Sequence, residues 1–232
     1  MPVYRIADLN VQMETFGRTQ KQAAPYRIQD NAPSDITIHS NPEGLLAQNP
    51  HLSLEDCEYL STGASFYYQL IHHNGVMLHS SCVVVGDRAY LFSAPSGTGK
   101  STHTHLWLRL FGERAYILND DKPAIRVLDG KIFVYGTPWS GKSDCSRNVR
   151  VELGGIAVLK RGAENTIRRM EPQETLFPLL NQTTRSRRPD EMEACLATIG
   201  ALSNSGKIFE LHCNMNILAA KVAYAAMSGE RI

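Results

Sequence analysis

The feature that most constrains this chain is a glycine-rich loop between a predicted strand and a predicted helix. Residues 90–111 read YLFSAPSGTGKSTHTHLWLRLF. The apolar residues 89–94 predict a buried strand, and the apolar spacing of residues 101–111 predicts a helix that ends at Gly112. A loop that leaves a strand and enters a helix offers an anion several backbone N–H groups and the positive end of the helix. The segment therefore predicts a phosphate-binding loop in an α/β fold.

Each residue type in the loop suits a task in nucleotide binding. Gly97 and Gly99 let the backbone curl, Lys100 supplies a charge for the β- and γ-phosphates, and Ser101 supplies a hydroxyl for Mg²⁺. Ala94 stands where the pattern G-x-x-x-x-G-K-[ST] has its first glycine. The candidate nucleotide-binding residues are Pro95, Ser96, Gly97, Thr98, Gly99, Lys100, Ser101 and Thr102.

A second Gly-Lys-Ser occurs at residues 141–143, within the segment YGTPWSGKSDCSRN. No apolar helical pattern follows it, so it does not repeat the strand–loop–helix arrangement. We expect a loop beside the first site, in which Lys142 and Arg147 meet a phosphate or an acidic substrate. A solvent-exposed basic loop is the alternative.

Two adjacent carboxylates follow the next predicted strand, in the segment AYILNDD. Ligand groups of α/β sheets gather at strand ends, so Asp120 and Asp121 are candidates for a metal ligand and a catalytic base. A turn-forming pair before Pro123 is the alternative. A further strand is predicted over residues 76–86, just before the strand that leads into the glycine-rich loop. His79 on this strand is a candidate contact for the γ-phosphate or for an aspartate, although buried structural histidines are common.

The order of these motifs resembles the catalytic domain of bacterial HPr kinase/phosphorylase and the related kinases that share a nucleotide core with phosphoenolpyruvate carboxykinase. The resemblance rests on LHSSCVVVGDRAYLFSAPSGTGKST, ILNDDKPAI and SRNVRVEL, and it covers residues 75–160. It implies catalytic roles for His79, Asp120, Asp121, Lys142 and Arg147. It also implies a magnesium site at Ser101 and Asp121, although the sequence does not say which aspartate holds the metal and which is the base.

The resemblance implies an α/β fold with a P-loop core and a mixed central sheet. We expect a small N-terminal β-rich lobe in residues 1–70 and a P-loop kinase-like catalytic domain in residues 71–232. The expected activity is Mg-ATP-dependent transfer of phosphate to a hydroxyl, chiefly serine, of a peptide, protein or small molecule. Another nucleoside phosphate donor remains open, and so does a homo-oligomer, because relatives often form oligomers.

Two other functions fit parts of the sequence. A non-catalytic nucleotide sensor would keep Lys100 and Ser101 without needing two aspartates and His79. A carboxykinase-type enzyme would use the same core on an oxaloacetate-like acid, but the chain is far shorter than those enzymes.

Composition narrows the partners. The chain has 232 residues, with 24 Lys and Arg against 23 Asp and Glu, so its charge does not indicate a nucleic-acid or anionic-membrane surface. Five cysteines without a Cys-x-x-Cys pair favour a reducing, cytoplasmic location. No segment is apolar enough to span a bilayer, and the N-terminus lacks a signal-peptide pattern.

Overall fold

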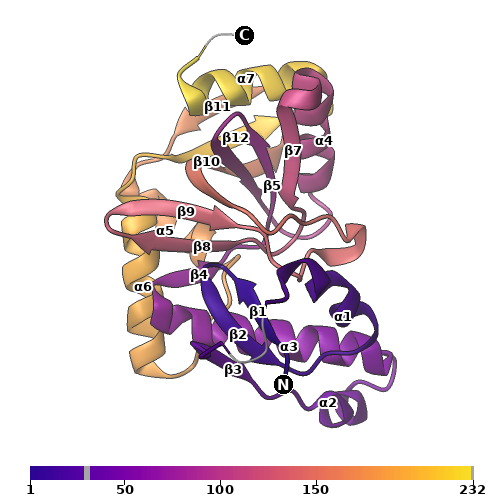
Figure 1. Cartoon of the computed structure of the whole chain (residues 1–232). Coiled ribbons are helices and arrows are strands. Elements are labelled where there is room, and N and C mark those ends of the chain that lie inside the picture. The colour runs from indigo at the N-terminus through magenta and orange to yellow at the C-terminus, as the bar shows by residue number, and fades with distance from the viewer. Residues whose placement is uncertain (29–31, 231–232) are drawn as a thin grey trace.

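A mixed α/β fold with two sheets is seen in the computed structural model of the chain, which describes residues 1–28 and 32–230. Figure 1 shows α4 and α7 together at one end, the N-terminal elements at the other end, and the β8–β9 hairpin between them. Within the described residues the α-helices are α1 (Gly17–Ala23), α2 (Pro42–Gln48), α3 (Leu54–Leu70), α4 (Lys100–Phe111), α5 (Pro172–Leu180), α6 (Pro189–Ser203) and α7 (Ile217–Ser228).

The smaller sheet has the strand order β1-β2-β3, and the larger one has the order β4-β8-β9-β10-β6-β5-β7, with β12 paired to β10 and β11. The strands of the smaller sheet are β1 (Val3–Ile6), β2 (Leu9–Met13) and β3 (Ile36–Ile38). Those of the larger sheet are β4 (Gly75–Met77), β5 (Ser80–Val85), β6 (Arg88–Ser93), β7 (Ala115–Asn119), β8 (Ala124–Leu128), β9 (Lys131–Tyr135), β10 (Arg150–Arg161), β11 (Thr166–Arg169) and β12 (Ile208–Cys213). The predicted α/β class and the mixed sheet are therefore confirmed.

Both faces of the larger sheet are buried. Successive residues of its inner strands point to opposite sides, and the residues on each side pack into a separate hydrophobic cluster. On β5, Cys82 and Val84 belong to one hydrophobic cluster, and Val83 and Val85 belong to another. The helices α5 and α6 cover the first face, and α4 and α7 cover the second. The two pairs of helices fix the sheet, and with it the loops at its edges.

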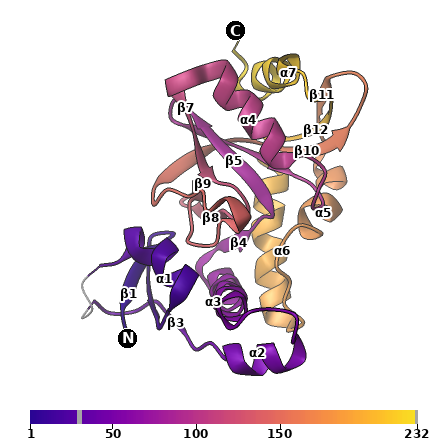
Figure 2. The same cartoon turned by 90° about the vertical axis from the view of Figure 1, so that its right-hand side faces the viewer.

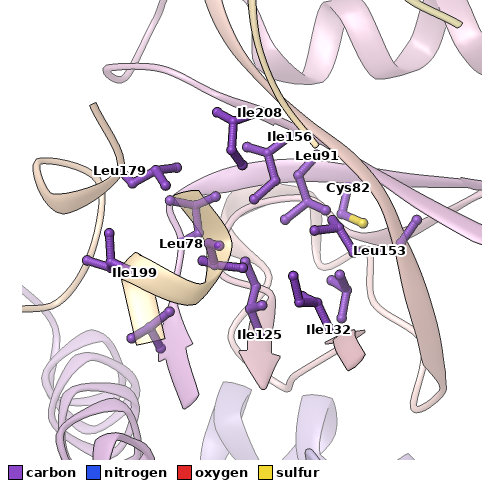
Figure 3. Close-up of a cluster of buried hydrophobic side chains, with 14 of the residues drawn as sticks. Leu78, Cys82, Leu91, Ile125, Ile132, Leu153, Ile156, Leu179, Ile199 and Ile208 are labelled. Atoms are coloured by element: carbon purple, nitrogen blue, oxygen red, sulfur yellow. The ribbon is translucent and has the colours of Figure 1, made fainter. Parts of the chain in front are cut away.

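Figure 3 shows the cluster on the α5–α6 side. Leu91 and Ile156 extend from neighbouring strands, while Leu179 of α5 and Ile199 of α6 approach from the side. All four side chains are at most 1% exposed. Burying a side chain of this size stabilises a fold by about 1.5–3 kcal/mol, so the cluster anchors the strands that carry the candidate site.

Three strand ends meet at one edge of this sheet. β5 runs antiparallel to β6, with Ser80 opposite Ser93, and antiparallel to β7, with Cys82 opposite Asn119. β6 and β7 therefore run in the same direction, and their carboxyl ends lie on either side of the start of β5. The glycine-rich loop follows β6, the acidic pair follows β7 and His79 precedes β5. The fold thus gathers the three predicted motifs.

The strand predicted over residues 76–86 is interrupted, so His79 does not lie within a strand. Leu78 forms an isolated bridge with Thr183, and the His79 N–H donates to the Gln182 carbonyl at 2.7 Å. The chain pairs there with the segment that follows α5 instead of with the sheet. This long-range pairing leaves the His79 side chain at the sheet edge, at the end of β6 where the glycine-rich loop begins.

The N-terminal 70 residues are richer in helix than the sequence predicts. α3 alone has 17 residues, whereas β1, β2 and β3 have 4, 5 and 3. The expected β-rich character is therefore wrong. The helix was hard to recognise in the sequence because its buried face includes Thr62 and Gly63 as well as Phe66 and Tyr67, so small and polar residues interrupt the apolar pattern.

The predicted domain boundary near residue 70 stays a prediction. Figure 2 shows the N-terminal strands and α3 set beside the rest of the chain. One hydrophobic cluster nevertheless joins Phe66 and Tyr67 of α3 to Tyr135 and Trp139. The N-terminal segment and the β8–β9 hairpin therefore share a core. No helix in residues 1–28 or 32–230 combines the length and the hydropathy needed to cross a membrane.

Candidate functional site

A cavity of about 640 Å³ lies between the glycine loop (residues 94–99) and the loop of residues 136–149, which joins β9 to β10. Its lining residues are His79, Ser96, Gly97, Gly99, Lys100, Ser101, Thr102, Asp120, Asp121, Ser140, Gly141, Lys142 and Ser143. The structure therefore brings most of the predicted site residues into one cavity.

The glycine loop leads directly into α4. Gly97 and Gly99 have φ angles of +77° and +120°, a region that residues with a Cβ adopt only with strain. Gly99 is the N-cap of α4 and supplies no side chain to the first turn. The first N–H groups of α4 are thus open to an anion in the cavity, where they add to the positive end of the helix dipole.

Lys100 lies across the glycine loop. Its ammonium donates to the carbonyls of Ala94 at 2.9 Å and Pro95 at 3.5 Å, and the residue is 7% exposed. Burial lowers the pKa of Lys100, while the charges of Asp121 and Asp120 act in the opposite direction. The ammonium is therefore poorly solvated and bonded to neutral carbonyl groups, so an anion in the cavity would gain a strong partner.

The acidic pair is fixed by Asn119, which is fully buried. Its Oδ1 accepts from the backbone N–H groups of Asp121 at 3.0 Å and Lys122 at 2.8 Å. Its Nδ2 donates to the Thr137 carbonyl at 3.1 Å. One amide therefore shapes the turn that carries Asp121 and ties it to the 136–149 loop.

Both carboxylate oxygens of Asp121 have a side-chain partner. Its Oδ1 is 3.3 Å from His79 Nε2, and its Oδ2 accepts from the Lys122 ammonium. Burial raises the pKa of Asp121, but the hydrogen bond from His79 and the charge of Lys122 outweigh that effect and lower the pKa to about 2. Gln182 holds the opposite nitrogen of His79 at 3.0 Å. Asp121 is therefore ionised at neutral pH and held in one orientation.

Asp120 is held from the other side. Its Oδ1 accepts from the Ser81 hydroxyl at 2.5 Å, and that hydroxyl lies 2.8 Å from the Thr104 hydroxyl of α4. Thr104 in turn donates to the Ser101 carbonyl at 3.0 Å. A chain of hydroxyl groups thus connects Asp120 to the first turns of α4, which carry Ser101.

The second Gly-Lys-Ser forms a short 3-10 turn, Gly141–Ser143, and Lys142 lines the cavity. The Gly141 N–H donates to the Tyr59 hydroxyl at 3.0 Å. Arg18 of α1 donates to the Gly141 carbonyl and, at 2.7 Å, to Asp144. The N-terminal segment therefore holds this loop in place across the cavity from the glycine loop.

Arg147 is not among the residues that line the cavity. Its guanidinium stacks on the Tyr116 ring of β7, 4.3 Å from the ring centroid, and its backbone N–H donates to the Leu118 carbonyl. Arg147 pairs the 136–149 loop to β7, and the structure does not bring its charge to the glycine loop.

Ser140 contributes a buried hydroxyl to the cavity. The residue is 1% exposed, and its Oγ has no hydrogen-bond partner among the residues that the structure describes. A buried unpartnered hydroxyl costs free energy unless a ligand or a water satisfies it. The cavity is thus suited to a polar ligand on the side of the 136–149 loop.

A second cavity, of about 520 Å³, shares Gly97, Gly99 and Thr102 with the first. Its walls include the apolar side chains of Leu106, Leu159 and Met215. At its rim Arg161 of β10 donates to the carbonyls of Gly97 at 2.5 Å and Thr98 at 3.2 Å, which holds the glycine loop to β10.

His103 lies in the wall of this second cavity. Burial lowers its pKa to about 4, and Trp107 Nε1 donates to its Nε2 at 3.1 Å. A neutral ring that accepts at Nε2 carries its proton on Nδ1, which lies 3.7 Å from Cys213 Sγ. His103 is therefore a packed structural residue.

Several residues of the site did not stand out in the sequence. Asn119 and Lys122 flank the acidic pair, so their position in ILNDDK was the available signal. Ser140, Arg161 and Gln182 follow the acidic pair by about 20 to 60 residues, and contacts between distant segments bring them near the site.

No family model matches the chain, and no curated protein matches it. Among solved structures, the Hpr(Ser) kinase/phosphatase from Coxiella burnetii is similar over 53% of this chain and 93% of that chain, with a TM-score of 0.31 and 10% sequence identity. A similarity of this size does not show that the two chains belong to one family.

Proposed function

We propose that the chain is a Mg-ATP-dependent phosphotransferase that transfers the γ-phosphoryl group to a hydroxyl, chiefly of serine. The observation that carries the proposal is a single cavity lined by Lys100, the uncapped start of α4 and both aspartates. A phosphate cradle alone would serve a nucleotide sensor. The two carboxylates and His79 in the same cavity favour transfer, because an acceptor hydroxyl must be positioned beside the phosphate.

The nucleotide would extend across the glycine loop. Its phosphate oxygens would accept hydrogen bonds from the N–H groups at the start of α4. The Lys100 ammonium would donate to phosphate oxygens in place of the Ala94 carbonyl. Its base would lie in the second cavity against Leu106, Leu159 and Met215. An apolar cavity that shares the glycine loop with a polar one suits a molecule with a flat base and a phosphate tail.

The oxygen donors of the cavity fit Mg²⁺, which is commonly held by one or two carboxylates together with water and substrate phosphates. Ser101 and Asp120 would hold it, because the Ser81–Thr104 chain connects Asp120 to α4 while His79 and Lys122 engage Asp121. This division differs from the sequence-based assignment of the metal to Asp121. The bound ion would neutralise phosphate charge.

Asp121 would orient the acceptor. In the step itself a bond forms between the acceptor oxygen and the γ-phosphorus, the bond from that phosphorus to the bridging oxygen breaks, and ADP leaves. The acceptor proton passes to an Asp121 oxygen. A carboxylate with a pKa of about 2 is a weak base, so its main contribution is orientation, which suits a reaction that depends chiefly on positioning and electrostatics. Lys142 would meet phosphate oxygens from the 136–149 loop.

Nucleotide binding can be tested by thermal unfolding. Saturating Mg-ATP should raise the Tm of the parent protein. At a nucleotide concentration a hundred times the Kd, binding adds about 2.7 kcal/mol to the free energy of unfolding. The Lys100→Ala variant should lose most of this rise. The Lys131→Ala variant, which removes an exposed lysine at the β8–β9 turn, should keep it. An equal rise in all three proteins would contradict the proposed role of the glycine loop.

Transfer can be tested by following labelled γ-phosphate with serine peptides, free serine and an oxaloacetate-like acid as acceptors. Asp121→Asn should retain the Mg-ATP-induced rise in Tm and lose transfer by about a hundredfold or more. Binding without transfer to any acceptor in the parent protein would favour the sensor. Use of the keto acid alone would favour the carboxykinase-type reaction.

A further inference from the structure

Two further cavities extend from Asp121 toward the N-terminal segment. The first, of about 400 Å³, shares His79, Ser96 and Asp121 with the cavity of the glycine loop, and its other lining residues are Met77, Lys122, Asn181, Gln182, Thr183 and Thr184. We call it the middle cavity. Beyond it lies a cavity of about 160 Å³ that shares Met77, Lys122 and Thr184 with the middle cavity. We call it the aromatic pocket. The shared residues place the three cavities next to one another, from the Asp121 carboxylate to the aromatic pocket.

The aromatic pocket is built from one face of α3 and from Trp139. Five α3 residues line it, at the helical spacing that places them on one side: Tyr59, Leu60, Gly63, Ala64 and Tyr67. Trp139 closes it, stacked on Phe66 with ring centroids 5.0 Å apart. Gly63 is required for this contact, because a Cβ there would lie 2.9 Å from Trp139 Cδ1.

The polar ends of these rings are already engaged. The Tyr67 hydroxyl donates to the Lys122 carbonyl at 2.5 Å, and the Tyr59 hydroxyl accepts from the Gly141 N–H. The Trp139 Nε1–H donates to the Thr62 hydroxyl at 3.2 Å. What the rings offer a ligand is therefore their apolar surface, and these hydrogen bonds hold the rings in place.

The carboxylate, lysine and arginine charges among the residues that line these two cavities are those of one ion pair, Asp121–Lys122. Lys122 is the one ionisable lysine or arginine among the residues that line the pocket, and its ammonium pairs with Asp121 while lying 5.8 Å from the Tyr59 ring centroid. The middle cavity adds the uncharged polar residues 181–184. From one end to the other, the surfaces are thus the Asp121–Lys122 ion pair, the neutral polar residues 181–184, and a pocket of mainly apolar side chains that Lys122 also lines.

We propose that the acceptor is a peptide whose serine is flanked, within a few residues, by a large apolar side chain that occupies the aromatic pocket. The surface of the neutral polar residues 181–184 suits a peptide backbone, which brings both donors and acceptors and no charge. A cavity of about 150 Å³ lined by apolar side chains is known to hold benzene, so a pocket of about 160 Å³ matches a phenylalanine or leucine side chain. This inference rests on the proposed phosphotransferase function, and it specifies the acceptor.

A peptide series tests the inference. The parent peptide carries one serine among alanines and glycines, and each variant places Phe, Leu, Asp or Lys at one position from three before to three after the serine. We expect one or two positions at which Phe or Leu raises kcat/KM by about tenfold or more over Ala, the effect of burying such a side chain. Preference for Asp or Lys, or equal use of all peptides and of free serine, would overturn the proposal.

A pair of variants assigns the preference to the pocket. Ala64→Phe places a ring into the pocket from an exposed position of α3, and Ala225→Phe makes the same change at an exposed position of α7. The ratio of kcat/KM between the best Phe peptide and the Ala peptide should fall to about one in the first variant and stay at the parent value in the second. A ratio that survives Ala64→Phe would place recognition elsewhere.

Peptide binding by calorimetry separates this inference from the proposed function. A Phe peptide that binds the parent protein more tightly than the Ala peptide, and loses that advantage in Ala64→Phe, supports the pocket even without phosphate transfer. Transfer to all peptides at equal rates and with equal affinities would leave the phosphotransferase in place and refute the pocket.

Discussion

Replacing Asn119 by alanine should be among the most damaging single changes near the site, although the residue touches no ligand in the proposed reaction. Its amide is fully buried and serves the acidic turn on one side and the 136–149 loop on the other. With alanine, the backbone N–H groups of Asp121 and Lys122 lose the side-chain oxygen that accepts their hydrogen bonds. The Thr137 carbonyl loses the amide group that donates to it.

The magnitude follows from these three bonds. Each contributes about 1 kcal/mol net, and a backbone group that is left buried without a partner costs more. The loss is therefore about 3 kcal/mol. For a chain of this length, 1 kcal/mol corresponds to about 2–4 °C in Tm, so the Tm should fall by about 6–12 °C.

Urea and thermal unfolding measure this loss, with Asn204→Ala as the matched control. Asn204 is the exposed C-cap residue of α6, and its replacement should change the free energy of unfolding by less than about 0.5 kcal/mol. If Asn119→Ala lowered the Tm by no more than the control does, with an unchanged m-value, Asn119 would not be the residue that fixes the acidic turn.

Two further changes test other contacts. Glu58 is 1% exposed, and burial raises its pKa despite the hydrogen bond from Thr19. The stability that the protonated carboxyl contributes is thus present below the unfolded pKa and lost as pH rises through the raised pKa, so the Tm of Glu58→Gln should rise relative to that of the parent as the pH increases above 4.5. A difference in Tm that does not change with pH would refute this. Gly141 has a φ angle of +72°, and a Cβ there would lie 2.7 Å from Asp121 Cβ, so Gly141→Ala should lower the transfer rate by about tenfold or more; a parent-like rate would show that the Asp121 carboxylate tolerates displacement.

The elements of the larger sheet were predictable because their signals are local. The turn between β8 and β9 is formed by Asp129 and Gly130, a residue pair typical of tight hairpin turns, and their φ angles are +50° and +74°. α4 ends at Gly112 for the same kind of reason, since its φ angle of +57° favours glycine. Local backbone preference fixed these positions without help from the rest of the fold.

The assembly of the site was less predictable because it depends on pairings across the chain. The interruption at His79 arises from a hydrogen bond to Gln182, about 100 residues later. The stacking of Arg147 on Tyr116 follows from the return of the 136–149 loop to β7, which also bridges Asn119 to Ser146. No local sequence pattern indicates such contacts. The sequence could therefore predict which residue types belong to the site, but not which residues lie next to them.

The cluster shared by α3 and the β8–β9 hairpin limits how the chain can be divided or recombined. A fragment that starts at residue 71 would keep the glycine loop and the acidic pair, yet it would uncover Trp139 and Tyr135, which are 0% and 2% exposed in the whole chain. Contiguous exposed aromatic surface promotes self-association. Asp144 would also lose Arg18. The N-terminal segment is thus not an exchangeable module, and a sequence that replaced it would have to supply both a cover for Trp139 and a cation for Asp144.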